Sequence, residues 1–226
     1  MSDKVRVEID GAVRTVTLTR PEKSNALDAD MLRELEEAFN PDPGPGPAER
    51  VAVIRSEGRV FCSGLDLRGS LGRDMDVEKL FHRVETWPLP VVAVVQGAAI
   101  AGGCELALHS DLVVASAEAR FGMSLAQVGL APSWFLTKKL LEVAGPVLTR
   151  EILLLGDPMP ATRMAELGLI ARCVAPEQVD ATAATFIDRL VRNAPLSLKA
   201  MKATINREMT FRDQLEHADT DALVRS

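Results

Sequence analysis

The order of apolar and polar residues predicts strands in the first half of the chain and helices in the second. Short β-branched or continuously apolar runs predict strands, at Val5 to Ile9, Val13 to Thr19, Val51 to Arg55, Val91 to Val95 and Leu112 to Ala115. Apolar residues at helical spacing predict one helix that begins after Asp28 and another that ends before Pro88. From Trp134 onward the chain is predicted to be mainly helical. This order favours an α/β core followed by a helical C-terminal region.

The composition is that of a globular protein and excludes several functional classes. The 226 residues are 47% hydrophobic and 26% charged, which fits one large domain. No apolar run approaches the ~20 residues of a membrane span, and none follows Met1 as a secretory signal would, so we expect a cytoplasmic protein. The net charge of −6, with 26 basic residues scattered among 32 acidic ones, argues against nucleic-acid binding. Three widely spaced cysteines predict neither a disulfide framework nor a metal site.

Two turns of small residues follow predicted strands and are candidates for chemistry. In the first, Gly102-Gly103 opens a predicted helix, where unpaired N–H groups and the helix dipole favour negative charge. Gly103 and Cys104 stand where a phosphate-binding loop needs Lys and Ser or Thr, and the glycine spacing does not match a dinucleotide site. An oxyanion hole therefore fits better, with Glu105 as the acid or base. The second turn, Phe61 to Leu67, places a further backbone donor within reach.

The structural alternatives at these positions are common ones. Glu105 could merely complement the helix dipole, and the two glycines could serve close packing of strand and helix. His109, four residues later on the same helix face, could tune Glu105 or be an ordinary helix histidine. Cys104 has no evident base and is a poor candidate for a nucleophile.

Several motifs, taken in order, resemble the crotonase (enoyl-CoA hydratase/isomerase) superfamily. They cover nearly the whole chain and are Arg20-Pro21 with Asn25-Ala26-Leu27, Phe61 to Leu67, Gly97 to Ala107 with Asp111, Phe121-Gly122, and Ala165 with Gly168-Leu169-Ile170. The resemblance implies an α/β fold, a crotonase-like spiral of repeated ββα units over residues 1–194. It also implies a C-terminal helical region for trimerisation over residues 195–226. We expect a homotrimer or a dimer of trimers, an acyl-CoA ligand, and no cofactor beyond the coenzyme A of the substrate.

The resemblance also implies roles for individual residues. The backbone N–H groups of Leu65 and Gly102 would hold the thioester oxygen, with Glu105 as the acid/base. The expected coenzyme A and acyl contacts are Lys23, Ser24, Asn25, Ala26, Ser63, Asp66, Leu67, Arg68, Leu125, Pro132 and Trp134. Asp66 could instead order its own turn, and Lys23 and Arg68 could meet phosphates or be solvated surface charges.

Departures from the family pattern leave the reaction open. The family's hydratases hold water with two glutamates, and Leu125 stands at the second position. Ser133-Trp134-Phe135 replaces the usual glycine-rich turn and resembles some isomerases, which keep the glutamate that is missing here. The sequence given ends at Ser226, short of a terminal helical segment that many members carry. The sequence therefore predicts an enzyme of hydratase/isomerase type, with a non-catalytic or weakly catalytic acyl-CoA-binding homologue or an acyl-CoA decarboxylase as alternatives.

Overall fold

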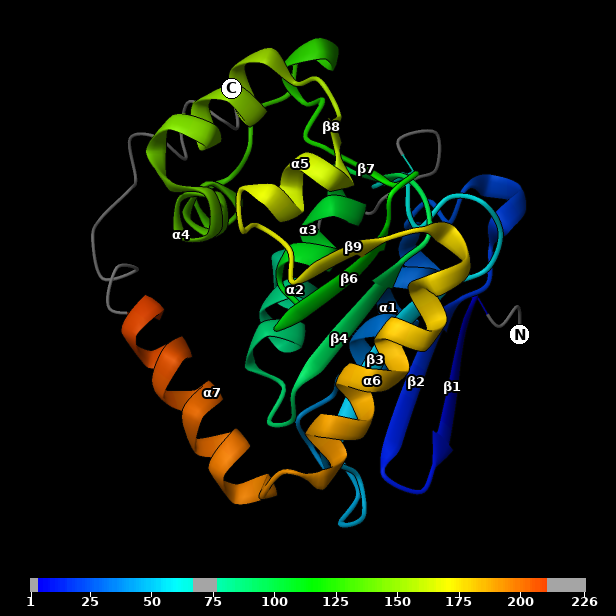
Figure 1. The fold of residues 1–226 in the computed structure, drawn as a ribbon. Helices are drawn as coiled ribbons and strands as arrows, with labels where there is room; N and C mark the ends of the chain where they lie inside the picture. Colours follow the sequence, from blue (N-terminus) through cyan, green and yellow to red (C-terminus); the bar gives the residue numbers. More distant parts are fainter. Residues whose placement is uncertain (1–3, 67–76, 211–226) are drawn as a thin grey trace.

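The computed structural model describes residues 4–66 and 77–210, which form a six-stranded sheet, a small three-stranded sheet and helices around both (Figure 1). The large sheet has the order β1-β2-β3-β4-β6-β9, and the small sheet has the order β5-β7-β8. The strands are β1 (Val5–Asp10), β2 (Val13–Leu18), β3 (Val51–Ser56), β4 (Val91–Val95), β5 (Ala99–Ile100), β6 (Leu112–Ser116), β7 (Arg120–Gly122), β8 (Met159–Pro160) and β9 (Arg172–Val174). The helices of at least six residues are α1 (Ala29–Ala38), α2 (Val77–Thr86), α3 (Gly102–Leu108), α4 (Trp134–Arg150), α5 (Ala161–Glu166), α6 (Val179–Arg192) and α7 (Pro195–Thr210). This arrangement confirms the predicted α/β fold.

The predicted hairpin and the first predicted helix are both present. Strand β1 runs antiparallel to β2, whereas β2, β3, β4, β6 and β9 are mutually parallel. The side chain of Asp28 accepts a hydrogen bond of 3.0 Å from the backbone N–H of Met31 and caps α1. Local sequence signals therefore decide where these elements begin.

The large sheet is buried on both faces. Strand β4 alternates strictly: Val91, Ala93 and Val95 belong to the main core with α1, α2 and α3, while Val92 and Val94 pack in a second core against α6. In Figure 1, α6 crosses one face of the sheet and α1 and α2 lie behind the other. A strand with this double burial is apolar at every position, which explains its continuous apolar run.

The C-terminal third is mainly helical, as predicted, but it also supplies two strands. Strand β9 completes the large sheet beside β6, and β8 pairs with β7 in the small sheet. Both are too short, at three and two residues, to give a recognisable sequence period. Helix α4 is interrupted at Gly145, which has a φ of 66°.

Helix α7 begins at Pro195, where the sequence predicts the start of a C-terminal helical region. The division into residues 1–194 and 195–226 is otherwise untested and stays a prediction. Within the described ranges, no helix has the length and apolar character needed to cross a membrane.

A buried asparagine fixes the turn that follows β2. Ser24 and Asn25 both have left-handed backbones, with φ of 54° and 52°. The fully buried side chain of Asn25 accepts a hydrogen bond from the Arg20 N–H and donates to the carbonyls of Glu57 and Val60, each at 2.9 Å. The amide thus joins the turn to the segment that follows β3.

We expect Asn25→Ala to lower the free energy of unfolding by at least ~2 kcal/mol, because each buried polar group left unpaired costs ~1–3 kcal/mol. Urea unfolding measures the change. Asn193→Ala is the matched control, since Asn193 is exposed and ends α6 without a capping bond from its side chain. Equal stability of the two variants would show that the Asn25 bonds do not hold the turn.

Candidate active site

Two loops meet at the start of α3. The loop after β3 pairs with the chain on either side of it, through parallel bridges of Leu65 with Leu27 and of Cys62 with Ala99. A Cβ added to Gly103 would lie 2.1 Å from the carbonyl oxygen of Cys62, so only glycine permits this approach. Gly103 therefore does serve close packing. Its lack of a side chain lets the loop that contains Cys62 lie against the first turn of α3.

The bridge to Leu27 determines where the N–H of Leu65 points. Leu27 donates to the carbonyl of Gly64 at 2.8 Å and accepts from the N–H of Asp66 at 2.9 Å. In a parallel bridge, the residue that lies between the two bonded residues of its own segment directs its N–H away from the neighbouring strand. Leu65 lies between Gly64 and Asp66 in this way. The Leu65 N–H accordingly has no acceptor among the described residues.

The N–H of Gly102 is the second unpaired donor. It lies in the first turn of α3, where N–H groups lack partners within the helix, and no acceptor for it is present in the described residues. The preceding residue, Ala101, has an unusual φ of 47° and is held there by its N–H bond of 2.8 Å to the carbonyl of Gly122. A Cβ added to Gly102 would lie 3.8 Å from the Leu65 nitrogen, so the two donors are close together.

A cavity of about 380 Å³ opens beside these two donors. Its lining residues are Ser63, Leu65, Val77, Glu78, Phe81, Ile100, Ala101, Gly102, Glu105, Met123, Ser124, Leu125, Val128, Leu130, Ala131, Pro132, Ser133 and Leu136. The lining is largely apolar, as is usual for a site that binds a small organic ligand. Three predicted elements of the site therefore share one wall: Leu65, Gly102 and Glu105.

Glu105 is the buried carboxyl group of this cavity. Its side chain is held by the first turn of α3, and the residue is only 7% exposed. Burial, followed by the negative charge of Glu78, raises the pKa of Glu105 to about 8. A carboxyl group with such a pKa can donate or accept a proton near neutral pH.

The neighbours of Glu105 on α3 have structural roles. A ring nitrogen of His109 lies 2.8 Å from the backbone carbonyl of Glu105, not from its carboxyl group. The His109 ring is stacked between Phe81 and Phe135, and burial lowers its pKa to about 3, so it stays neutral. Burial raises the pKa of Cys104 to about 12, which agrees with the prediction that it is not a nucleophile.

Some of the predicted acyl contacts line the cavity and others do not. Leu125 and Pro132 line the cavity, whereas Trp134 is half-buried at the start of α4 and does not. Leu67 and Arg68 lie outside the described residues. Ser63 lines the cavity next to Leu65.

The two segments expected to border coenzyme A lie side by side. The N–H of Ser63 donates to the carbonyl of Ser24 at 3.1 Å, which joins residues 23–26 to residues 63–66. Asp66 forms an ion pair of 3.0 Å with Arg20, which also links these two segments. The Asn25 side chain is fully buried and bonded within the protein, and is therefore not available to a ligand. Lys23 is exposed, and Ala26 is half-buried.

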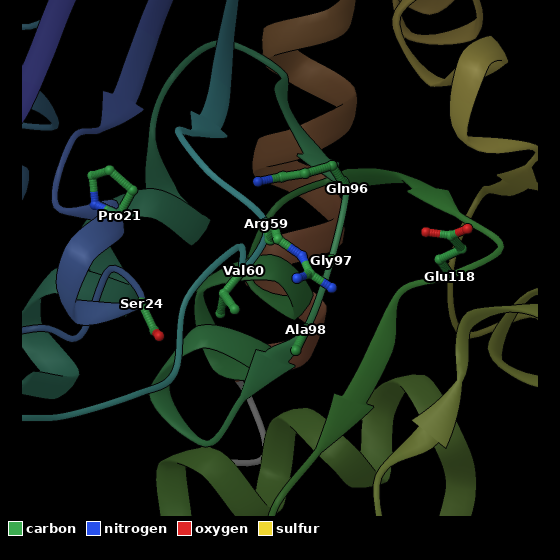
Figure 2. A pocket seen from close by; sticks show the side chains of 8 residues that line it. All are labelled: Pro21, Ser24, Arg59, Val60, Gln96, Gly97, Ala98 and Glu118. Carbon is green, nitrogen blue, oxygen red and sulfur yellow. The ribbon is translucent and has the colours of Figure 1, made fainter.

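A broader depression of about 670 Å³ lies at the ends of the strands and includes Ser24 (Figure 2). Its other lining residues are Pro21, Arg59, Val60, Gln96, Gly97, Ala98 and Glu118. In Figure 2, Ser24 and Glu118 lie on opposite sides of this depression. It contains none of the three site elements described above, so the smaller cavity is the candidate active site.

The sequence analysis missed Glu78, a second carboxylate on the cavity wall. It lies in the first turn of α2, three residues before the cavity residue Phe81 and next to Val77. This helical spacing puts Glu78 on the same face of α2 as Phe81. The spacing was the signal in the sequence from which Glu78 could have been found. No cluster of three or more potential metal ligands occurs in residues 4–66 and 77–210.

Comparisons with known proteins identify the family of the chain. A family profile described as enoyl-CoA hydratase/isomerase matches residues 8–224. The chain belongs to this family. It is 30% identical over 215 residues to a short-chain-enoyl-CoA hydratase of Clostridium acetobutylicum, covering 92% of this chain and 82% of that protein. A crotonyl-CoA hydratase of Syntrophomonas wolfei is 27% identical, over 97% of this chain and 88% of its own.

Solved structures of family members share the fold. An enoyl-CoA hydratase of Mycobacterium tuberculosis has a TM-score of 0.81 and 33% identity, covering 92% of this chain and 91% of its own. An enoyl-CoA hydratase/carnithine racemase of Magnetospirillum magneticum has a TM-score of 0.87 and 29% identity, covering 100% and 88%. The crotonase-like fold and the family's enzymatic class, both expected from the motifs, are thereby confirmed.

The raised pKa of Glu105 predicts a pH-dependent stability difference between the wild type and Glu105→Gln. The folded protein holds this proton to about pH 8, whereas the unfolded chain releases it near the ordinary glutamate pKa of 4.5. The free energy of unfolding of the wild type therefore falls as the pH rises from 4.5 to about 8. The variant has no carboxyl group at position 105 and does not show this fall. Relative to the wild type, we expect the variant to gain a few kcal/mol, at ~1.4 kcal/mol per pKa unit.

Urea unfolding between pH 5 and pH 8 measures this difference. Glu37→Gln is the control for removal of a glutamate elsewhere, because Glu37 is exposed and lies on α1. Parallel curves for the wild type and Glu105→Gln would contradict the raised pKa.

Proposed function

We propose that this enzyme adds water across the double bond of a 2-enoyl-CoA thioester. The observation that carries the proposal is the convergence of two unpaired backbone N–H groups, of Leu65 and Gly102, with the buried Glu105 on one cavity wall. The names of the related hydratases support the thioester class for the substrate.

The two N–H groups would donate hydrogen bonds to the thioester oxygen. They withdraw electron density from the carbonyl, so the β-carbon becomes electrophilic and the enolate that follows attack is stabilised. Loss of one such donor typically costs ~3 kcal/mol of transition-state stabilisation. Because both donors are backbone groups, the apolar side chain of Leu65 does not conflict with this role.

Glu105 would exchange a proton with the substrate beside the enolate. Its pKa of about 8 leaves it mainly protonated at neutral pH, which suits donation of a proton to the α-carbon. The apolar walls around it, among them Phe81, Met123 and Leu125, exclude competing water.

A panel of 2-enoyl-, 3-enoyl- and malonyl-type CoA thioesters, read by mass spectrometry, tests the reaction. We expect the 2-enoyl thioesters to gain one water. We expect Glu105→Gln to lower kcat by roughly 10² or more, with little change in the affinity for a saturated acyl-CoA, because a general acid/base contributes 10²–10⁴-fold.

Other outcomes of the panel support other reactions. Turnover of only the 3-enoyl or malonyl-type thioesters would replace hydration by isomerisation or decarboxylation. Saturable binding with no turnover would support the acyl-CoA-binding alternative, which Leu125 on the cavity wall favours. Full activity of Glu105→Gln would refute its role.

We also propose that the protein forms a homotrimer or a dimer of trimers. One face of α7 is anchored by Lys202, whose ammonium group lies 2.6 Å from a carboxylate oxygen of Asp111. Other α7 side chains are apolar and exposed: Leu196 is 80% exposed, and Met201 and Ile205 are each 61% exposed. Exposed apolar side chains along one helix are typical of a surface that another subunit covers.

Sedimentation velocity of the full chain at micromolar concentration tests the assembly. We expect the mass of three or six chains, and a shift toward monomer for the double substitution Met201→Glu and Ile205→Glu. A wild-type monomer would overturn the trimer proposal. Phe211, Leu215 and Leu223, apolar residues of the expected C-terminal trimerisation region, lie outside the described residues.

Three further expectations rest on the sequence alone. They are a cytoplasmic location, the absence of a cofactor beyond the coenzyme A of the substrate, and the domain division at residue 195.

A further inference from the structure

The cavity wall carries a second acidic side chain on a different element from Glu105. Helix α2 contributes Val77, Glu78 and Phe81 to the lining, while Glu105 comes from α3. Glu78 and Glu105 are the two ionisable side chains among the described lining residues. Chemistry that needs two proton-transfer groups therefore has two candidates in this cavity.

The Glu105 carboxyl group has no partner among the described residues. No hydrogen bond or ion pair to it occurs within the described residues, although it is 7% exposed and lines the cavity. Buried polar groups are nearly always hydrogen-bonded, to protein, water or ligand. A water molecule or a ligand in the cavity is therefore the expected partner.

Glu78 lines the same cavity as Glu105. Its charge is the second cause, after burial, of the raised pKa of Glu105. Glu78 itself is solvent-exposed at the start of α2, so water stabilises its negative charge. The adjacent Lys79 instead forms an ion pair of 3.1 Å with Glu36.

We propose that Glu78 is the second catalytic carboxylate, which takes a proton from the attacking water while Glu105 gives a proton to the α-carbon. The inference rests on the proposed hydration. It assigns to Glu78 the acceptance of a proton from water, which the alkyl side chain of Leu125 cannot perform. The remaining polar lining side chains, Ser63, Ser124 and Ser133, are hydroxyls and are much weaker bases than a carboxylate.

The proton count of this step balances. Water loses a proton to the Glu78 carboxylate as its oxygen bonds to the β-carbon, and the electrons of the double bond move onto the thioester oxygen as an enolate. The enolate then takes the proton of Glu105 at the α-carbon. After product release, the proton on Glu78 returns to Glu105 through solvent, which restores both groups.

Kinetics of Glu78→Gln test this role. We expect kcat for 2-enoyl-CoA hydration to fall by about 10²-fold or more, with the affinity for a saturated acyl-CoA unchanged within about twofold. Glu78→Asp, which keeps a carboxylate, should recover part of the rate. Glu37→Gln is the control for removal of one surface charge and should keep the wild-type rate.

The pH dependence separates catalysis from a structural role. If Glu78 is the base, Glu78→Gln should change the shape of the kcat–pH profile as well as its height. His109, which follows α3, is held neutral by burial and does not account for such a change. In ¹³C-carboxyl NMR titration, Glu78→Gln should also lower the pKa of Glu105, because a like charge has been removed.

The outcomes distinguish the two proposals. Loss of activity in Glu105→Gln but not in Glu78→Gln would overturn the role of Glu78 and leave the hydration intact. A shift in the Glu105 pKa with an unchanged rate would likewise overturn it, because Glu78 would then act only through its charge. Absence of hydration by the wild type would overturn both proposals.

Discussion

The contact between the loop at residues 61–65 and the first turn of α3 is the constraint on which the site depends. It requires the absence of a side chain at Gly103, where a Cβ would lie 2.1 Å from the Cys62 carbonyl oxygen. The parallel bridge between Leu27 and Leu65 then orients the Leu65 N–H, and the strained backbone of Ala101 orients that of Gly102. Both donors are thus positioned by chain packing and not by side-chain rotamers, which costs no reorganisation when negative charge develops.

The same packing explains the unusual state of Glu105. Helix α3 lies in the main core, so its first turn carries the carboxyl group into apolar surroundings without a bonded partner. Burial of an unpaired carboxyl is unfavourable for folding as the pH rises, since its charged form is desolvated. The site keeps this destabilising group in place, as expected where a proton must be held near neutral pH. The two-sided core of the large sheet, with α6 on its second face, supplies stability elsewhere.

The sequence predicted those elements and site residues whose signal lies in neighbouring residues of the chain. The hairpin, the Asp28 cap and the doubly buried β4 follow from periods and turn chemistry, and the ordered motifs indicated the fold. Strands β8 and β9 were missed because their pairing partners, β7 and β6, decide them and their own lengths leave no period. At the site, Leu65, Gly102 and Glu105 were predictable because each lies in a motif. Glu78 was not, because a glutamate in a first helical turn is usually explained by the helix dipole, and only the fold brings it to the cavity.

An oxyanion hole made of backbone groups would separate stabilisation of the enolate from proton transfer. A site made of side chains combines these two properties. Under the proposed mechanism, substitution of a cavity side chain such as Leu125 would leave the Leu65 and Gly102 N–H groups where the chain packing puts them, and with them the stabilisation of an enolate. The reaction that follows then depends on which carboxyl groups reach the α- and β-carbons, and from which wall. In this chain one such group is buried on α3 and the other is exposed on α2. Burial gives Glu105 a strong tendency to hold its proton, which suits the role of an acid in such a pair.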